Sequence, residues 1–221
     1  FRSHEVEDIV GRAGCKVLVL WPGFKAIDFR AILAGVDPAA LSSLTDVVVY
    51  REGEGAAFDT PGRRVTAVEA LLACEPLDEP GAAADARCVI FTTSGTTKAP
   101  KFVCHRQWGV VQHARDVADH FEMSVPGARV LQALPLCGVF GFTQALAALS
   151  AGAPMRMLPV FDAAEAASVL NAEAITHANG GDDMLERMLA VRPEPRPFPA
   201  LRFFGYAKFN PALEDLVEPY L

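Results

Sequence analysis

The sequence predicts an α/β fold, a mostly parallel, doubly wound sheet flanked by helices. Short runs rich in β-branched and apolar residues recur along the 221 residues and alternate with segments of helical periodicity. This alternation is typical of βαβ units. The runs are almost continuously apolar, as expected for strands that are covered on both faces. At about 150 residues per domain, the chain has room for one large domain or one and a half.

The predicted strands share a length of five or six residues and an excess of apolar residues. They are residues 16–21, 46–50, 88–93, 129–134, 155–160, 174–178 and 201–206. Helices are expected between most of them, and a further helix, residues 5–13, precedes the first strand. Residues 105–121 carry apolar side chains at helical spacing, at Trp108, Val111, Ala118 and Phe121. The order of these segments is the basis for the doubly wound sheet.

Two helix starts are marked by acidic residues. Asp162 and Glu165 form a capping-box pattern, in which the Asp162 carboxylate accepts orphan amide protons of the first turn. Asp182 and Asp183 follow two glycines and suit the positive end of a helix. Both helices are therefore predicted to begin directly after a turn.

The chain is expected to divide into two subregions, about 1–85 and about 86–221. The first includes a loop-like stretch, 53–86, rich in Gly, Pro and acidic residues around one short helix. The chain begins with Phe rather than Met, and we expect it to be a piece of a longer protein.

Composition narrows the function classes. The formal net charge is −7 and no block of Lys and Arg occurs, which argues against a nucleic-acid partner. No apolar run approaches the roughly 20 residues of a membrane span, and no signal peptide is visible. The five cysteines are scattered and never form a C-x-x-C pair, which favours reduced thiols in a cytoplasmic protein. The sequence leaves a homo-oligomer open.

The stretch FTTSGTTKAPKFV, residues 91–103, places five hydroxyl side chains and a glycine between a predicted strand and a predicted helix. Gly95 can adopt positive φ, and successive main-chain amides can form a concavity that holds an anion. The hydroxyls of Thr92, Thr93, Ser94, Thr96 and Thr97 add donors, and Lys98 and Lys101 add positive charge. A polyphosphate is the natural ligand. The stretch is not a Walker A loop, which needs a second glycine before the lysine.

The same stretch resembles the signature loop of the AMP-forming adenylating enzymes, which include acyl-CoA synthetases, aryl-CoA ligases, luciferases and peptide-synthetase adenylation domains. Their pattern is roughly T-S-G-T-T-G-x-P-K-G. The matching residues are Thr93, Ser94, Gly95, Thr96, Thr97, Pro100 and Lys101. Lys98 and Phe102 replace the second and third glycines. The resemblance assigns Thr93, Ser94, Gly95, Thr96, Thr97, Lys98 and Lys101 to the phosphates of ATP.

Two further segments resemble the part of the family that surrounds the acyl group. Residues 134–159 resemble a stretch with a P-x-x-H-x-x-G core, in which Gly141 matches but Gly138 replaces the histidine. Residues 198–216 resemble the strand, G-G-A turn and helix that flank the acyl pocket. His177, expected to end a strand at the ligand crevice, is a further candidate. The pocket residues that this resemblance implies are Gly138, Phe140, Gly141, His177, Gly205, Tyr206 and Ala207.

The resemblance implies ATP- and Mg²⁺-dependent activation of a carboxylic acid to an acyl-adenylate, followed by transfer to a thiol, with coenzyme A as the expected acceptor. No acid occurs in residues 135–141, so a simple organic or fatty acid is favoured over an amino acid. The family's Y-G-x-T-E motif, ribose aspartate and small C-terminal domain are not found in the chain. We therefore expect these 221 residues alone to be inactive, and we assign no catalytic residue and no metal ligand within them.

Other interpretations stay open. The departures at Lys98, Phe102 and Gly138 are also compatible with a non-catalytic nucleotide- or acyl-binding relative of the family. A simpler alternative is an α/β domain whose Ser/Thr loop binds phosphate generically. Two sets of polar residues are not assigned a catalytic or metal-binding role. Cys104 and His105 are interpreted as adjacent by coincidence rather than as a nucleophile and its base. His113, Asp116 and His120 are interpreted as a solvated helix face.

Overall fold

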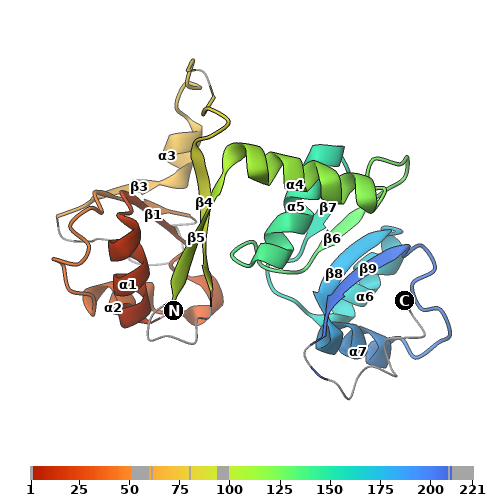
Figure 1. The fold of residues 1–221 in the computed structure, drawn as a ribbon. Coiled ribbons are helices and arrows are strands. Elements are labelled where there is room, and N and C mark those ends of the chain that lie inside the picture. The colour runs from red at the N-terminus through yellow and green to blue at the C-terminus, as the bar shows by residue number, and fades with distance from the viewer. Residues whose placement is uncertain are drawn as a thin grey trace. The chain divides into compact units, whose positions relative to one another are not determined.

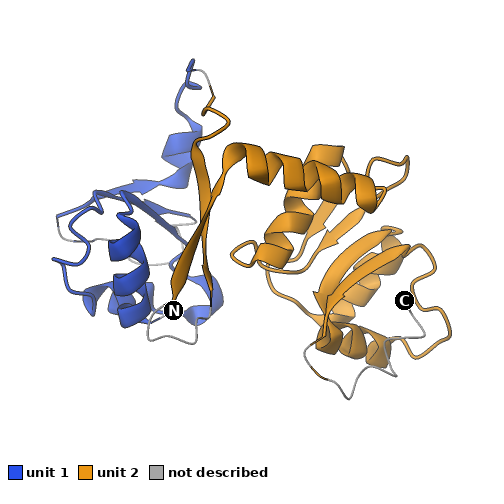
Figure 2. Ribbon diagram, viewed as in Figure 1, with its two compact units in different colours: residues 1–79 blue, residues 80–221 orange. Residues whose placement is uncertain are grey.

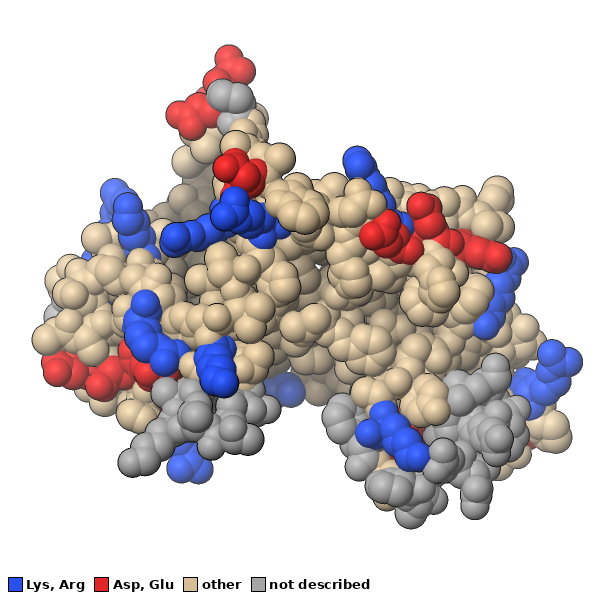
Figure 3. All heavy atoms as spheres, viewed as in Figure 1, with Lys and Arg blue, Asp and Glu red and all other residues tan. Residues whose placement is uncertain are grey.

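The structure is a computed structural model of the chain, and it describes residues 2–50, 60, 62–79, 81–93, 100–208 and 210. The chain forms two compact units, residues 1–79 and residues 80–221 (Figure 2). In the part of the chain that is described, no helix is both long enough and apolar enough to cross a membrane. On the face drawn in Figure 3, lysines and arginines are interspersed with acidic and uncharged residues.

Unit 1 is built on a three-stranded parallel sheet. Its strands are β1 (Val17–Leu20), β2 (Asp46–Val49) and β3 (Arg64–Ala67), with β2 in the centre. The helices are α1 (Ser3–Ala13), η1 (Phe24–Ala26), α2 (Phe29–Ala34) and α3 (Val68–Leu72) (Figure 1). The Ser3 hydroxyl donates a hydrogen bond to the Ile32 carbonyl at 2.6 Å, which joins α1 to α2. Val47 and Val49 of β2 are completely buried, so the core of this unit lies along its central strand.

Two expectations for unit 1 differ in outcome. The predicted strands at 16–21 and 46–50 and the helix at 5–13 are confirmed by β1, β2 and α1. The loop-like interpretation of 53–86 missed β3. Arg64–Ala67 pairs in register with Asp46–Val49, and a strand that is defined by a distant partner has little local signal.

Unit 2 begins with an antiparallel hairpin of β4 (Arg87–Thr93) and β5 (Lys101–Arg106). The helix α4 (Gln107–His120) follows β5 directly. The expectation that the signature loop leads directly into a helix starting at residue 105 is wrong, because the strand β5 lies between the loop and α4. The loop therefore connects two strands rather than a strand and a helix.

The remainder of unit 2 is a four-stranded parallel sheet in the order β7-β6-β8-β9. The strands are β6 (Val130–Gln132), β7 (Met155–Met157), β8 (His177–Gly181) and β9 (Phe203–Ala207). They alternate with α5 (Val139–Ala151), α6 (Ala163–Ala172) and α7 (Asp182–Val191) (Figure 1). The prediction of an α/β fold with mostly parallel strands and flanking helices is thus confirmed, with the strands divided among separate sheets.

The core of this sheet is formed where α6 and α7 pack on it. Leu131 and Leu170 are 1% exposed and Ile175 is 2% exposed, and all three belong to one apolar cluster. The predicted cap is present, because the Asp162 carboxylate accepts the Glu165 amide at 2.9 Å. The predicted start at Asp182 is also found as the first residue of α7.

His177 does not end a strand, and that expectation is wrong: β8 begins at this residue. Its partners across the sheet are Val130 and Phe203, the first residues of β6 and β9. The side chain is 1% exposed. Its Nε2 atom lies 2.6 Å from the Phe121 carbonyl, which can only accept, so Nε2 carries the proton, and Nδ1 lies 2.7 Å from the Thr176 hydroxyl. His177 therefore braces the amino-terminal edge of the sheet.

Burial lowers the pKa of His177 below its ordinary value, although the Phe121 carbonyl acts in the opposite direction. A histidine whose pKa is lower in the folded state binds its proton more readily in the unfolded chain. Stability is therefore complete above the unfolded pKa of about 6.5 and is lost as the pH falls below it, until the lower folded pKa is reached.

We expect the free energy of unfolding of unit 2 to fall with pH below about 6.5, with a contribution from His177 of at most about 1.4 kcal/mol per pH unit. His177→Gln should flatten this dependence, and the exposed His113 of α4, replaced by Gln, is the matched control that should leave it unchanged. Urea denaturation at a series of pH values measures both. An equal slope in the wild type and His177→Gln would contradict the assignment.

Candidate active site

The hairpin presents the ends of the signature loop side by side. Thr93 is the last residue of β4, Lys101 is the first residue of β5, and the two are paired in the register. Both are exposed to solvent. The other predicted phosphate-binding residues, Ser94, Gly95, Thr96, Thr97 and Lys98, lie outside the described residues. The two ends of the hairpin thus fix where the loop leaves the sheet and where it returns.

An aromatic contact joins the hairpin to α5. The ring of Phe91, two residues before the end of β4, meets the ring of Phe142 edge to face, with centroids 5.2 Å apart. Phe91 is only 8% exposed, and its other ring neighbour is His105 of β5 at 6.0 Å. Phe142 lies one residue after Gly141 in the first turns of α5. The stem of the signature loop is therefore anchored next to the segment that the sequence assigns to the acyl pocket.

The start of α5 folds closely onto the loop before it. A Cβ atom at Gly141 would lie 2.5 Å from the Pro135 carbonyl oxygen and 3.0 Å from the Leu134 Cβ. Any side chain at this position would collide with backbone, so the close approach requires glycine. The glycine that sequence comparison singled out thus has a packing reason.

Gly138 is different, because neither backbone nor packing requires a glycine there. It caps α5 with φ −97°, an angle that any residue adopts. A Cβ atom there would meet only the Pro135 carbonyl oxygen, at 3.7 Å. Gly138 therefore leaves open the space that the family's histidine side chain would fill.

Residues from the middle and the carboxyl ends of β8 and β9 complete this site. Gly205 pairs with Asn179, and a Cβ atom on Gly205 would lie 2.5 Å from the Asn179 Oδ1 atom and 3.5 Å from the Phe140 Cζ atom. Tyr206 and Ala207 follow on the same strand, paired with Gly180 and Gly181. The structure therefore brings Phe140 close to Gly205.

Asn179 is not among the residues predicted from the sequence, and His177 lies at a different position in its strand from the one expected. Asn179, which touches the Gly205 position, was not predicted, and only the strand register between β8 and β9 could have identified it. His177, which was predicted, is the first residue of β8, two residues before Asn179, and it pairs with Phe203 rather than with Gly205. The described geometry does not bring His177 to the other pocket residues.

Asp182 fixes the chain that follows β9. It is 1% exposed at the amino terminus of α7. Its carboxylate accepts the amide of Asp183 at 2.9 Å and the amide of Asn210 at 2.7 Å. The second bond ties the segment after Ala207 to the start of α7, where a negative charge is favourable.

Apolar side chains are exposed around this site. The exposed fractions are 45% for Leu136, 54% for Val139, and 37% for both Phe140 and Tyr206. A hollow of about 250 Å³ lies nearby, between the hairpin, α4 and α5, and Phe91, Phe142 and Leu146 line it. Such apolar, concave surfaces suit the hydrocarbon part of a small ligand.

The structure also locates the polar residues of β5 and α4. Cys104 and His105 are consecutive residues of β5, so their side chains point to opposite faces, and the Cys104 thiol lies 4.0 Å from the His105 carbonyl. On α4, His113, Asp116 and His120 are all exposed, and Asp116 accepts from Gln112 at 2.7 Å. Across the described ranges, no group of three His, Cys, Asp or Glu side chains is arranged to hold a metal ion.

The family described as AMP-binding enzyme matches residues 1–220 of the chain. The chain therefore belongs to this family of AMP-forming adenylating enzymes. An indoleacetate–CoA ligase from Aromatoleum aromaticum is 35% identical over 139 residues, which cover 61% of this chain and 27% of that protein.

Solved structures resemble the fold as well. A Rhodopseudomonas palustris protein assigned as a long-chain-fatty-acid CoA ligase has a TM-score of 0.80 at 22% identity, covering 99% of this chain and 51% of its own. The inhibitor-bound N-terminal domain of FACL13 from Mycobacterium tuberculosis has a TM-score of 0.69 at 24% identity, covering 100% and 52%. ATP-bound MatB from Rhodopseudomonas palustris has a TM-score of 0.67 at 18% identity, covering 93% and 38%. The chain spans about half or less of the length of these relatives.

The packing at Gly141 makes a stability prediction. Gly141→Ala should lower the free energy of unfolding of unit 2 by about 1–3 kcal/mol, because its methyl group collides with the Pro135 carbonyl. Gly109→Ala in α4 is the matched control, since a Cβ atom there meets nothing within 4 Å. This control should be neutral or stabilising by up to about 1 kcal/mol. Thermal or urea unfolding distinguishes the two, and equal effects of the two substitutions would refute the close approach.

Proposed function

We propose that the protein containing this chain uses ATP to activate a carboxylic acid as an acyl-adenylate, and then transfers the acyl group to the thiol of coenzyme A. Membership of the AMP-binding enzyme family supports this reaction class. One structural observation carries the proposal for this chain. Phe91, in the stem of the signature loop, contacts Phe142, and Phe140 on the same helix approaches Gly205, which supports a site shared by the loop and the candidate acyl pocket.

In the proposed reaction, the substrate carboxylate attacks the α-phosphorus of ATP and pyrophosphate leaves. Two anions must be aligned, and charge on the departing pyrophosphate must be stabilised. We assign the second task to the loop whose ends are Thr93 and Lys101, with the hydroxyls of Ser94, Thr96 and Thr97 as further donors. Gly95 lets the backbone approach the phosphates, and Lys98 adds a second charge. Mg²⁺ is expected to enter with the triphosphate, and no described residue is assigned to it.

We place the acyl group against Gly138, Phe140, Gly141, Gly205, Tyr206 and Ala207. The open space at Gly138 and the exposed rings of Phe140 and Tyr206 favour an apolar or aromatic acid. No Asp or Glu occurs in residues 135–141, so the α-amine of an amino-acid substrate would find no carboxylate partner there. His177 is left out of this pocket because it is the first residue of β8 and both of its ring nitrogens lie against other groups, the Phe121 carbonyl and the Thr176 hydroxyl.

A non-catalytic nucleotide- or acyl-binding relative is the second candidate. The observation that favours it is the replacement of two glycines by Lys98 and Phe102 in the signature loop. Phe102 lies within β5, opposite Thr92, where a bulky residue is compatible with the hairpin. Nucleotide binding without turnover would identify this alternative.

We also propose that these 221 residues do not form acyl-adenylate on their own. The chain covers 27% of the indoleacetate–CoA ligase and about half of the structural relatives, and the motifs that the family uses for adenine and ribose are not found in it. The full-length protein is therefore the form in which activity should be measured.

Carboxylate-dependent exchange of pyrophosphate with ATP tests the proposal. The full-length protein should catalyse exchange with indoleacetate or a fatty acid and not with an α-amino acid, and the 221-residue chain should not catalyse it. Lys101→Ala should lower kcat/KM about 100-fold, because it removes the positive charge that stabilises the leaving pyrophosphate. Arg106→Ala, at the other end of β5 and equally exposed, is the control and should leave exchange unchanged. Pyrophosphate exchange by Lys101→Ala at the wild-type rate would contradict the assignment of the loop to the phosphates of ATP.

A further inference from the structure

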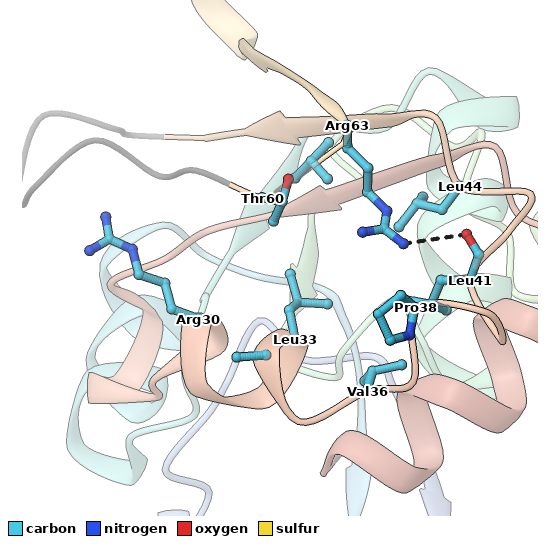
Figure 4. A pocket seen from close by; sticks show the side chains of 10 residues that line it. Arg30, Leu33, Val36, Pro38, Leu41, Leu44, Thr60 and Arg63 are labelled. Carbon is cyan, nitrogen blue, oxygen red and sulfur yellow. Dashed lines mark hydrogen bonds between the residues drawn. The ribbon is translucent and has the colours of Figure 1, made fainter.

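Unit 1 contains a cavity that the proposed function does not use. It has a volume of about 410 Å³, within the usual range for small-molecule sites. Figure 4 shows Leu33 on one side, Pro38, Leu41 and Leu44 on the other, and Val36 below them. All of these residues belong to unit 1, and none of them is among the residues assigned to the candidate active site.

Two hydrogen-bonding groups in this apolar cavity lack a partner. The Thr60 side chain is 8% exposed, and its Oγ1 atom is buried with no hydrogen-bond partner among the described residues. The same holds for the Nε atom of Arg63. The only bond drawn for Arg63 in Figure 4 is a long one, 3.4 Å from Nη2 to the Leu41 carbonyl. An unpaired buried donor is unfavourable, although the Arg63 residue as a whole is partly exposed.

The neighbouring arginine shows the contrast. Arg64 is the first residue of β3, and its side chain is 77% exposed. It pairs with the carboxylate of Asp46 on the adjacent strand. Arg63 is turned instead into the apolar cavity, where the described residues offer it a carbonyl and no carboxylate. Two successive arginines thus differ in whether the protein itself supplies their anion.

We propose that this cavity of unit 1 binds a small carboxylate with a short apolar tail. The carboxylate would accept from the Arg63 Nε–H and the Thr60 hydroxyl, which are donors of the kind that charged oxygens prefer. The tail would lie against Leu33, Val36, Pro38 and Leu44. This is a second site for a carboxylate, distinct from the acid that is activated, and it does not depend on the proposed reaction.

Hexanoate is the probe, and 1-hexanol is the same tail without the charge. Binding to the full-length protein is followed without ATP by NMR, through the methyl resonances of Leu33, Val36 and Leu44. Hexanoate should shift these resonances saturably and bind at least 10-fold more tightly than 1-hexanol. Lengthening the acid by one methylene should tighten binding about fourfold until the cavity is full.

The variants separate the anion site from general charge. Arg63→Gln should weaken hexanoate at least 10-fold, and Thr60→Val should weaken it about 5-fold. Arg64→Gln, which removes the same charge one residue away, should leave the affinity unchanged. The proposal would be overturned by any one of three results. These are methyl resonances that do not shift with hexanoate, equal affinities for hexanoate and 1-hexanol, or equal losses of hexanoate affinity in Arg63→Gln and Arg64→Gln. None of these results depends on whether the protein exchanges pyrophosphate.

Discussion

The contact between the rings of Phe91 and Phe142 is the interaction on which the candidate active site depends. A two-stranded hairpin is at best marginally stable in water by itself. The β4–β5 hairpin gains its position in unit 2 by burying Phe91 against α5 and by running directly into α4. Without that contact, the loop that we assign to the phosphates would have no fixed relation to the residues that we assign to the acyl group.

The second constraint is the close folding at the start of α5. Gly141 allows the helix to approach the Pro135 carbonyl, and this approach sets where Phe140 and Phe142 project. Phe140 then reaches the middle of β9 at Gly205, while Phe142 reaches the hairpin. The β4–β5 hairpin, the start of α5 and the strand β9 are distant in sequence, and Phe140 and Phe142 in the first turn of α5 thus connect them. Asp182 secures the remaining segment by accepting the Asn210 amide.

Much of this could be predicted from the sequence where the signal is local. The strands β1 and β2, the cap at Asp162 and the start of α7 are each specified by a few consecutive residues, and they are found as predicted. The β5 strand and β3 were missed because each is defined by its partner strand. His177 was misplaced because the register of β8 depends on β6 and β9, and a shift of a few residues moves a side chain from one sheet edge to the other. Asn179 was missed for the same reason. Gly141 was identified by resemblance, but its packing reason is visible only in three dimensions.

A double-mutant cycle on Phe91 and Phe142 tests the central claim most directly. Each phenylalanine is replaced by leucine alone and together, and the free energy of unfolding of unit 2 is measured by urea denaturation. If the rings hold the hairpin against α5, the two substitutions should be coupled by about 0.5–1.5 kcal/mol beyond the sum of their separate effects. Strictly additive effects would mean that the rings do not interact, and the proposed link between the signature loop and the acyl pocket would be contradicted.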